Sequence, residues 1–202
     1  MKNKYSEIIN ELTDKELIRH LYTTQIILIA LSLVLSIFLF DEHSFWQQIN
    51  LFDLDILTIG LTAGLLVVLI DFLFTKWLPS TYYDDGGLNE RIFRNQNFVQ
   101  IFWITIFVAF SEEMLFRGII QTKIGLIWAC LLFAAVHYRY LFNWFLFLNI
   151  ILLSFLIGFI FAWTNNLAVT IVMHFVIDFL SGIQIRWKNI NKVNEQEGSF
   201  HE

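Results

Sequence analysis

Long apolar runs alternate with short polar segments along the chain, and the runs predict six membrane-spanning helices. A helix needs about 20 residues to cross the hydrocarbon core of a bilayer. The fourth predicted span is short for a crossing. The pattern therefore indicates an all-α fold, a polytopic transmembrane helical bundle of about six spans. The expected spans are residues 22–40, 56–74, a third that begins near Phe98, 125–137, 141–163 and 167–187.

Two polar segments predict short helices on the membrane surface. The first has apolar side chains at the spacing of one helical face, at Tyr5, Ile8, Ile9 and Leu12. Thr13 and Glu16 then predict a capping box at the start of the helix that leads into the first span. The second segment follows the turn signal TYYDDGG at 81–87 and places apolar residues on one helical side, at Leu88, Ile92 and Phe93.

A single bundle accounts for the chain, because the sequence contains no internal repeat, low-complexity tract or second domain. Residues 1–97 are expected to hold the interfacial helix, two spans and the surface helix. Residues 98–187 form the core in which the polar residues discussed below gather, and residues 188–202 form a polar tail.

Composition agrees with a membrane setting. Hydrophobic residues make up 57 % of the chain and charged residues 15 %, whereas a soluble domain carries about 25 % charged residues. No basic cluster with interleaved aromatic residues occurs, so nucleic acid is not an expected partner. The single cysteine, Cys130, has no partner for an intramolecular disulfide and is interpreted as a packing residue. The first span lacks a small-residue cleavage site and is expected to remain as an anchor.

Lysine and arginine residues gather at alternate ends of the spans, which favours a multi-pass protein of the cell membrane with both termini in the cytoplasm. They precede the first span, follow the second and follow the sixth, whereas the 41–55 loop has none. Arg117 and Lys123 do not fit, because a six-span path places them on the outer side. Two interpretations stay open: the third and fourth helices are not simple crossings, or Arg117 is held by the residues around it.

The third span carries charges in the stretch AFSEEMLFRG, residues 109–118. A charged side chain at the bilayer centre costs about 2.5–3.5 kcal/mol on insertion scales, so such residues normally face the bundle interior and are paired. Glu113 and Arg117 are four residues apart and share a helical face, so we expect them to neutralise each other. Glu112 lies about 100° around the helix from Glu113 and is left to act as a base.

Two other spans carry titratable groups at helical spacing. His137 is the only ionisable residue of LLFAAVHY, and His174 and Asp178 are four residues apart on one face of another helix. Each group by itself is compatible with a structural role. Their occurrence on three separate helices of a small protein favours a common functional site.

In order and spacing, these residues resemble the motifs of the CAAX protease and bacteriocin-processing family, also called CPBP or Abi. EEMLFR at 112–117 matches the EExxxR motif, FAAVH at 133–137 the FxxxH motif, and HFVID at 174–178 the HxxxN/D motif. The resemblance covers about residues 98–185, and the surrounding residues are similar to those of small bacterial members. The 98–187 segment is therefore expected to be the catalytic core.

The resemblance implies an intramembrane endopeptidase that hydrolyses a peptide bond in a membrane-tethered protein or peptide, in CAAX-type processing or in bacteriocin processing or immunity. It implies that Glu112 and His137 activate a water molecule, that His174 and Asp178 stabilise the oxyanion, and that Glu113 and Arg117 support the site. An ionised aspartate cannot donate a hydrogen bond. Asp178 is therefore either protonated by burial beside Glu112, or ionised and orienting His174; the second account is favoured.

Two alternatives remain open at the level of mechanism and function. Histidines with carboxylates are good zinc ligands, so a zinc site at Glu112, His137 and His174 competes with the favoured metal-free mechanism, although the HExxH signature is absent. The competing function is a non-proteolytic membrane protein, either an immunity or scaffold subunit or a small transporter with a proton relay. Asp71, near the end of the second span, could extend such a relay and is interpreted as interfacial.

Overall fold

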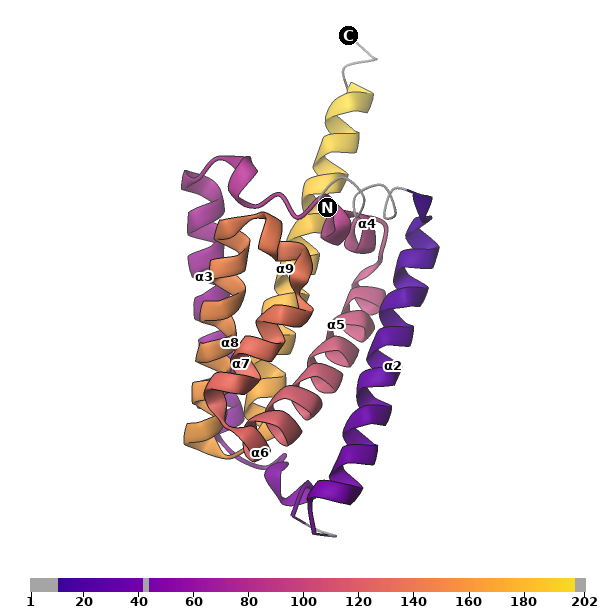
Figure 1. The fold of residues 1–202 in the computed structure, drawn as a ribbon. Helices are drawn as coiled ribbons and strands as arrows, with labels where there is room; N and C mark the ends of the chain where they lie inside the picture. The colour runs from indigo at the N-terminus through magenta and orange to yellow at the C-terminus, as the bar shows by residue number, and fades with distance from the viewer. Residues whose placement is uncertain (1–10, 42–43, 199–202) are drawn as a thin grey trace.

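The computed structural model describes residues 11–41 and 44–198, and this part of the chain is built of helices without any strand (Figure 1). Five helical stretches are long and apolar enough to cross a membrane. The predicted all-α polytopic bundle is confirmed, and the chain is a multi-pass membrane protein. The five stretches are Asp14–Leu39, Ile56–Trp77, Phe98–Ile124, Trp144–Thr164 and Leu167–Asn191.

The fourth predicted span is a short helix rather than a full crossing. Helix α7, Leu126–Val136, has 11 residues, which rise about 16 Å against a hydrocarbon core of about 30 Å. The 3-10 segment η5, Tyr138–Phe142, then connects it to α8, Trp144–Thr164. The bundle therefore consists of five long helical stretches and one half-length helix, instead of six complete spans.

Helix α2, Asp14–Leu39, begins with the predicted capping box. The Thr13 side chain accepts a hydrogen bond from the Glu16 backbone N–H at 3.3 Å, and the Glu16 carboxylate accepts one from the Thr13 N–H at 2.8 Å. The helix therefore starts before the apolar run, and the first span forms its later part. The expected surface helix with Tyr5, Ile8 and Ile9 lies outside the described residues.

Helix α4, Leu88–Phe93, is the predicted surface helix after the TYYDDGG turn. Gly86 and Gly87 have φ angles of +79° and +77°, a left-handed conformation that glycine adopts without a steric penalty. Asp14 at the start of α2 accepts hydrogen bonds from Arg91 Nε at 2.9 Å and Arg94 Nη2 at 2.8 Å. These ion pairs fasten α4 to the end of the bundle where α2 begins.

Close packing of α3 against α9 depends on two glycines. The second span consists of the π-helical segment η2, Ile56–Leu61, and helix α3, Thr62–Trp77. A Cβ atom on Gly60 would lie 2.6 Å from the Val169 carbonyl oxygen, and one on Gly64 would lie 2.9 Å from the Met173 carbonyl oxygen. The Gly60-x-x-x-Gly64 pattern thus lets the second span approach α9, Leu167–Gly198, as small residues do at membrane helix interfaces. Helix α9 includes residues 188–198 of the predicted polar tail.

The third long stretch runs from helix α5, Phe98–Glu113, through the π-helical segment η4, Met114–Gln121, to the short helix α6, Thr122–Ile124. The start of α2 and the end of α9 lie at one end of the bundle, and α6 lies at the other (Figure 1). Helix α7 starts beside α6 and leads back toward the end that holds α4. The helices that carry the predicted site residues, α5, α7 and α9, thus share one bundle.

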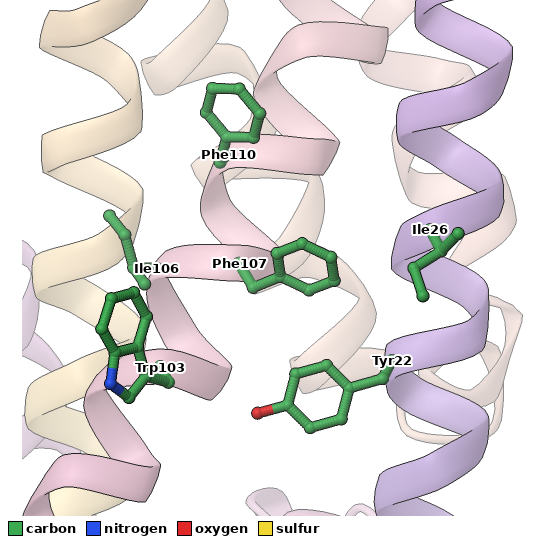
Figure 2. Close-up of a pocket in the computed structure, with 6 residues that line it drawn as sticks. All are labelled: Tyr22, Ile26, Trp103, Ile106, Phe107 and Phe110. Atoms are coloured by element: carbon green, nitrogen blue, oxygen red, sulfur yellow. The ribbon is translucent and has the colours of Figure 1, made fainter.

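An apolar groove of about 440 Å³ separates α2 from part of α5 (Figure 2). Glu112 lies nine residues after Trp103, roughly 180° around the helix from it. The groove therefore faces away from the predicted base and is not part of the candidate site. Its lining residues are Tyr22 and Ile26 on α2 and Trp103, Ile106, Phe107 and Phe110 on α5.

Candidate active site

The glutamate motif lies where the α-helix changes to a π-helix. Helix α5 ends at Glu113, and η4 begins at Met114. Every residue from Ser111 to Ile119 is buried, including Glu112, Glu113 and Arg117. π-Helical turns are rare and occur frequently at functional sites. The local irregularity therefore coincides with the most buried charged side chains among the described residues.

Arg117 is enclosed completely by the protein. Its Nε lies 3.4 Å from Glu113 Oε2, and neither side chain is exposed. Its Nη2 donates a hydrogen bond to Ser154 Oγ on α8 at 3.2 Å, and its guanidinium carbon lies 5.1 Å from the Phe133 ring centroid. The expected pairing of Glu113 with Arg117 is present. Both interpretations of Arg117 agree with the geometry: surrounding residues hold it, and α7 is too short for a simple crossing.

His174 lies between two carboxylates. Its Nδ1 is 3.0 Å from Glu113 Oε1, and its Nε2 is 3.5 Å from Asp178 Oδ2. A neutral imidazole carries a proton on only one of its two nitrogens, whereas an imidazolium can donate from both. Glu113 contacts both Arg117 and His174. A continuous set of contacts between ionisable side chains thus runs from Arg117 to Asp178.

Exposure increases along this set toward Asp178. The side chains of Glu113 and Arg117 are fully buried, that of His174 is 7 % exposed and that of Asp178 is 32 % exposed. Since Asp178 lies one turn beyond His174 on α9, the cluster becomes accessible in the direction of the C-terminal end of that helix. That end of the bundle also holds α4 and the start of α2 (Figure 1).

His137 is the C-cap residue of α7, and its Nδ1 lies 2.8 Å from the Phe133 carbonyl oxygen. A carbonyl oxygen can only accept, so Nδ1 must carry the proton in this hydrogen bond. In the neutral ring the Nε2 atom then holds the lone pair. His137 is partly exposed, which leaves this nitrogen available for proton transfer.

The Phe133 ring connects the three predicted motifs. Its centroid lies 4.6 Å from that of His137 and 6.3 Å from that of His174, and Arg117 lies over the same ring. Since these residues come from α7, α9 and η4, the motifs meet at one aromatic side chain in the bundle interior.

Glu112 differs from its neighbour Glu113 in having no such partner. Its exposed fraction is 8 %, and within residues 11–41 and 44–198 no hydrogen bond or ion pair joins it to another side chain. The structure thus brings Glu113, Arg117, His174 and Asp178 into direct contact and joins His137 to them through Phe133. It does not join Glu112 to His137 or His174 by a direct contact.

The donor set does not fit a preformed metal site. No group of three or more histidine, cysteine, aspartate or glutamate side chains among the described residues could hold a metal ion. Glu112, His137 and His174, the residues considered as zinc ligands, are therefore not gathered as a coordination sphere needs.

Among the residues that contact the cluster, sequence reasoning missed Ser154 and the wider contacts of Phe133. Ser154, which is fully buried, accepts the hydrogen bond from Arg117, and the signal that could have found it is its position as an isolated hydroxyl within an apolar run of α8. Phe133 belongs to the FxxxH pattern, but its sequence position does not reveal that it contacts His174 and Arg117 as well as His137.

Comparison with known proteins identifies similar chains. A family model described as "Type II CAAX prenyl endopeptidase Rce1-like" matches residues 94–180. The uncharacterized protein YpbD of Bacillus subtilis (strain 168) is 39 % identical over 175 residues, which cover 86 % of this chain and 93 % of that protein. The UPF0177 protein YxdF of Lactococcus lactis subsp. lactis is 29 % identical over 112 residues, covering 53 % of this chain and 62 % of that protein. No solved structure matches the chain significantly.

Proposed function

The chain belongs to the Rce1-like family of type II CAAX prenyl endopeptidases, and from this membership we propose that it is an intramembrane endopeptidase that cleaves a membrane-tethered protein or peptide. The observation that carries the proposal is the meeting of the three motifs at Phe133. Titratable groups from α5, from α9 and from the end of α7 gather there, and ionisable residues at membrane depth are by default functional.

Glu112 is the base that activates water in this proposal. Glu113 is already the partner of Arg117 and His174, so its charge is engaged, whereas Glu112 has no partner among the described side chains. A carboxylate without a cationic partner is available to accept a proton. Glu112 takes a proton from water, and the resulting hydroxide attacks the carbonyl carbon of the scissile peptide bond.

His137 assists this proton transfer. Its Nδ1–H is held by the Phe133 carbonyl oxygen, so its Nε2 can accept the proton that Glu112 has taken from water and deliver it to the leaving amine. Peptide hydrolysis needs both steps, because the nitrogen must be protonated before the C–N bond breaks.

His174 stabilises the negative oxygen of the tetrahedral intermediate. Glu113 accepts the hydrogen bond from Nδ1, so Nε2 donates to the oxyanion when the ring is an imidazolium, which carries a proton on both nitrogens. Asp178, 3.5 Å from Nε2, orients the ring. Arg117 neutralises Glu113 and keeps that carboxylate in the position that fixes His174.

The proposal is tested by peptide cleavage with the purified protein in detergent. A quenched peptide substrate is incubated with the wild type, Glu112→Ala and His137→Ala. Both variants are expected to lose about 100-fold or more in rate, since general acid and base groups contribute roughly 10²–10⁴-fold. Lys123→Ala, an exposed change at the α6 end, serves as the matched control and is expected to cleave like the wild type. Equal rates in all four proteins would exclude the protease.

A metal-free mechanism is part of the proposal and has its own measurement. The purified protein is expected to cleave at full rate after treatment with a chelator. Stoichiometric zinc that a chelator removes together with activity would overturn the metal-free mechanism while leaving peptidase activity intact.

The competing function is a non-proteolytic membrane protein, such as an immunity or scaffold subunit or a proton-relay transporter. A relay needs titratable groups staged along a path. Asp71 is partly buried on α3, but no hydrogen bond or ion pair connects it to another residue of the described part of the chain. The gathered groups therefore favour the peptidase. An immunity function without proteolysis would give no cleavage by the wild type in the same assay.

A further inference from the structure

The position of the His137 ring depends on more than its own helix. His137 has φ −86° and ψ 37°, outside the helical conformation, because it follows the last residue of α7. Within the described chain, the hydrogen bond of its ring joins Nδ1 to the Phe133 carbonyl oxygen. One bond restrains one ring atom, so the direction of Nε2 depends on what lies against the ring.

Among the described residues, the rings of Phe133 and Tyr140 lie against the His137 imidazole. The Phe133 centroid lies 4.6 Å away with an interplanar angle of 33°. The Tyr140 centroid lies 6.1 Å away with an interplanar angle of 2°. Tyr140 is thus the ring parallel to the imidazole, and offset parallel stacking is a preferred arrangement of aromatic groups.

The hydroxyl of Tyr140 is held by two donors. Asn89 Nδ2 donates to it at 3.4 Å, and Arg139 Nη2 donates to it as well. Arg139 Nη2 also donates to Asn89 Oδ1 at 3.2 Å, so the three residues form a closed set of hydrogen bonds. The Arg139 guanidinium carbon lies 4.5 Å from the centroid of the Tyr140 ring.

Asn89 belongs to α4, whose position is fixed independently of η5. Arg91 of the same helix and Arg94, its C-cap residue, pair with Asp14 at the start of α2. Helix α4 is therefore anchored to the bundle end, and through Asn89 it fixes the Tyr140 ring. The plane of the Tyr140 ring, which lies parallel to the His137 imidazole, is therefore fixed by a segment about 50 residues earlier in the chain.

We propose that Tyr140 is a positioning residue for His137, whose ring sets the plane of the imidazole and whose hydroxyl is anchored by Asn89 and Arg139. The inference rests on the proposed function, in which His137 Nε2 transfers a proton. Tyr140 acts through His137 and not on the substrate. Its contribution is to the orientation of Nε2, and a small misplacement of a catalytic group lowers the rate strongly.

Two substitutions distinguish the role of the Tyr140 ring from the role of its hydroxyl group. Tyr140→Leu removes both, and its kcat in the peptide assay is expected to fall about 10- to 100-fold with KM unchanged. Tyr140→Phe keeps the ring and is expected to retain at least tenfold more activity than Tyr140→Leu. Asn89→Ala removes one hydroxyl anchor and is expected to lose no more than Tyr140→Phe.

A role confined to anchoring η5 gives a different result, because both Tyr140 variants lack the hydroxyl. Equal kcat losses in Tyr140→Phe and Tyr140→Leu would overturn the inference, as would a wild-type kcat in Tyr140→Leu. Tyr82→Leu is the matched control: Tyr82 contacts the Trp144 and Phe145 rings near the same bundle end and is expected to keep the wild-type kcat. Thermal unfolding of each variant shows that it is folded.

Failure of this inference is distinguishable from failure of the proposed function. If the wild type cleaves no peptide, or if His137→Ala cleaves like the wild type, the proposed peptidase mechanism fails. If His137→Ala loses activity while Tyr140→Leu keeps its kcat, only the positioning role of Tyr140 fails.

Discussion

At the residue scale, the partners of Glu113 determine the roles left for its neighbours. Its carboxylate lies 3.4 Å from Arg117 Nε and 3.0 Å from His174 Nδ1, with no exposed surface. Removing one partner from a buried ion pair costs roughly 3–5 kcal/mol, because the remaining charge stays uncompensated. Glu113 is therefore committed to this network, and Glu112, one residue earlier, remains available for chemistry.

Asp178 is the residue on which the oxyanion proposal depends most directly. Asp178→Asn keeps an amide oxygen where the carboxylate oxygen lies 3.5 Å from His174 Nε2, so the ring keeps its orientation and we expect cleavage of the quenched peptide within about tenfold of the wild type. His174→Ala removes the oxyanion donor itself and is expected to lose about 10²–10³-fold in kcat.

The comparison of these two variants distinguishes the accounts of Asp178. A collapse of Asp178→Asn to the level of His174→Ala would show that the negative carboxylate is required. An increase above the wild type would instead indicate that the amide N–H group donates to the oxyanion.

At the element scale, the regular α-helix is interrupted beside Glu113 and again beside His137. The π-helical η4 follows Glu113 directly, and α7 ends at Val136 just before His137. If α7 were long enough to cross the membrane, His137 would be part of the helix and the 3-10 turn that carries Tyr140 would be lost. The short helix therefore makes room for η5, which links the site to α4.

Gly60 determines how closely the second span approaches α9, the helix with His174 and Asp178. In Gly60→Ala, the new methyl group would lie 2.6 Å from the Val169 carbonyl oxygen, so α9 or η2 must shift. Overpacking of this kind costs about 1–3 kcal/mol. We expect a lower thermal midpoint in detergent and a lower rate of peptide cleavage.

Thr62→Ala is the control for this substitution. Thr62 is exposed on α3, and its hydroxyl bonds to carbonyl groups of its own helical stretch. Its loss is expected to leave both measurements near the wild-type values. A Gly60→Ala protein with unchanged stability and rate would contradict the close-packing role of this glycine.

At the scale of the whole molecule, lysine and arginine residues are distributed unequally between the two ends of the bundle. The end with the start of α2 and the end of α9 carries Lys15, Lys76, Arg91, Arg94 and Lys188, among others (Figure 1). At the α6 end, Lys123 is the single lysine or arginine of the described residues. Basic residues favour the cytoplasmic side, so we propose that the first end, toward which the buried cluster becomes accessible, faces the cytoplasm.

Cysteine labelling of intact cells tests this orientation. In a Cys130→Ala background, Lys123→Cys is expected to react with a membrane-impermeant thiol reagent in intact cells, whereas Lys188→Cys reacts only after the membrane is opened. Both lysines are exposed, so a difference in labelling reports the side of the membrane. The reverse pattern would place the α6 end in the cytoplasm.

The sequence by itself determined the features that depend on near neighbours along the chain. Helical stretches, the Thr13 and Glu16 capping box, the TYYDDGG turn and the pairing of Glu113 with Arg117 all follow from periodicity or from contacts within four residues. The assignment to membrane proteins followed as well, because several apolar runs are long enough to cross the hydrocarbon core of a bilayer. These predictions needed no knowledge of how the helices pack.

Only the tertiary structure decided which groups meet across helices. It showed that His174 contacts Glu113 and not Glu112, that Ser154 binds Arg117, and that Phe133 lies against residues of all three motifs. Helical spacing gives the face on which a side chain lies, but the rotation and sliding of one helix against another are set by packing. The close approach at Gly60 and the anchoring of Tyr140 by Asn89 are contacts of this kind.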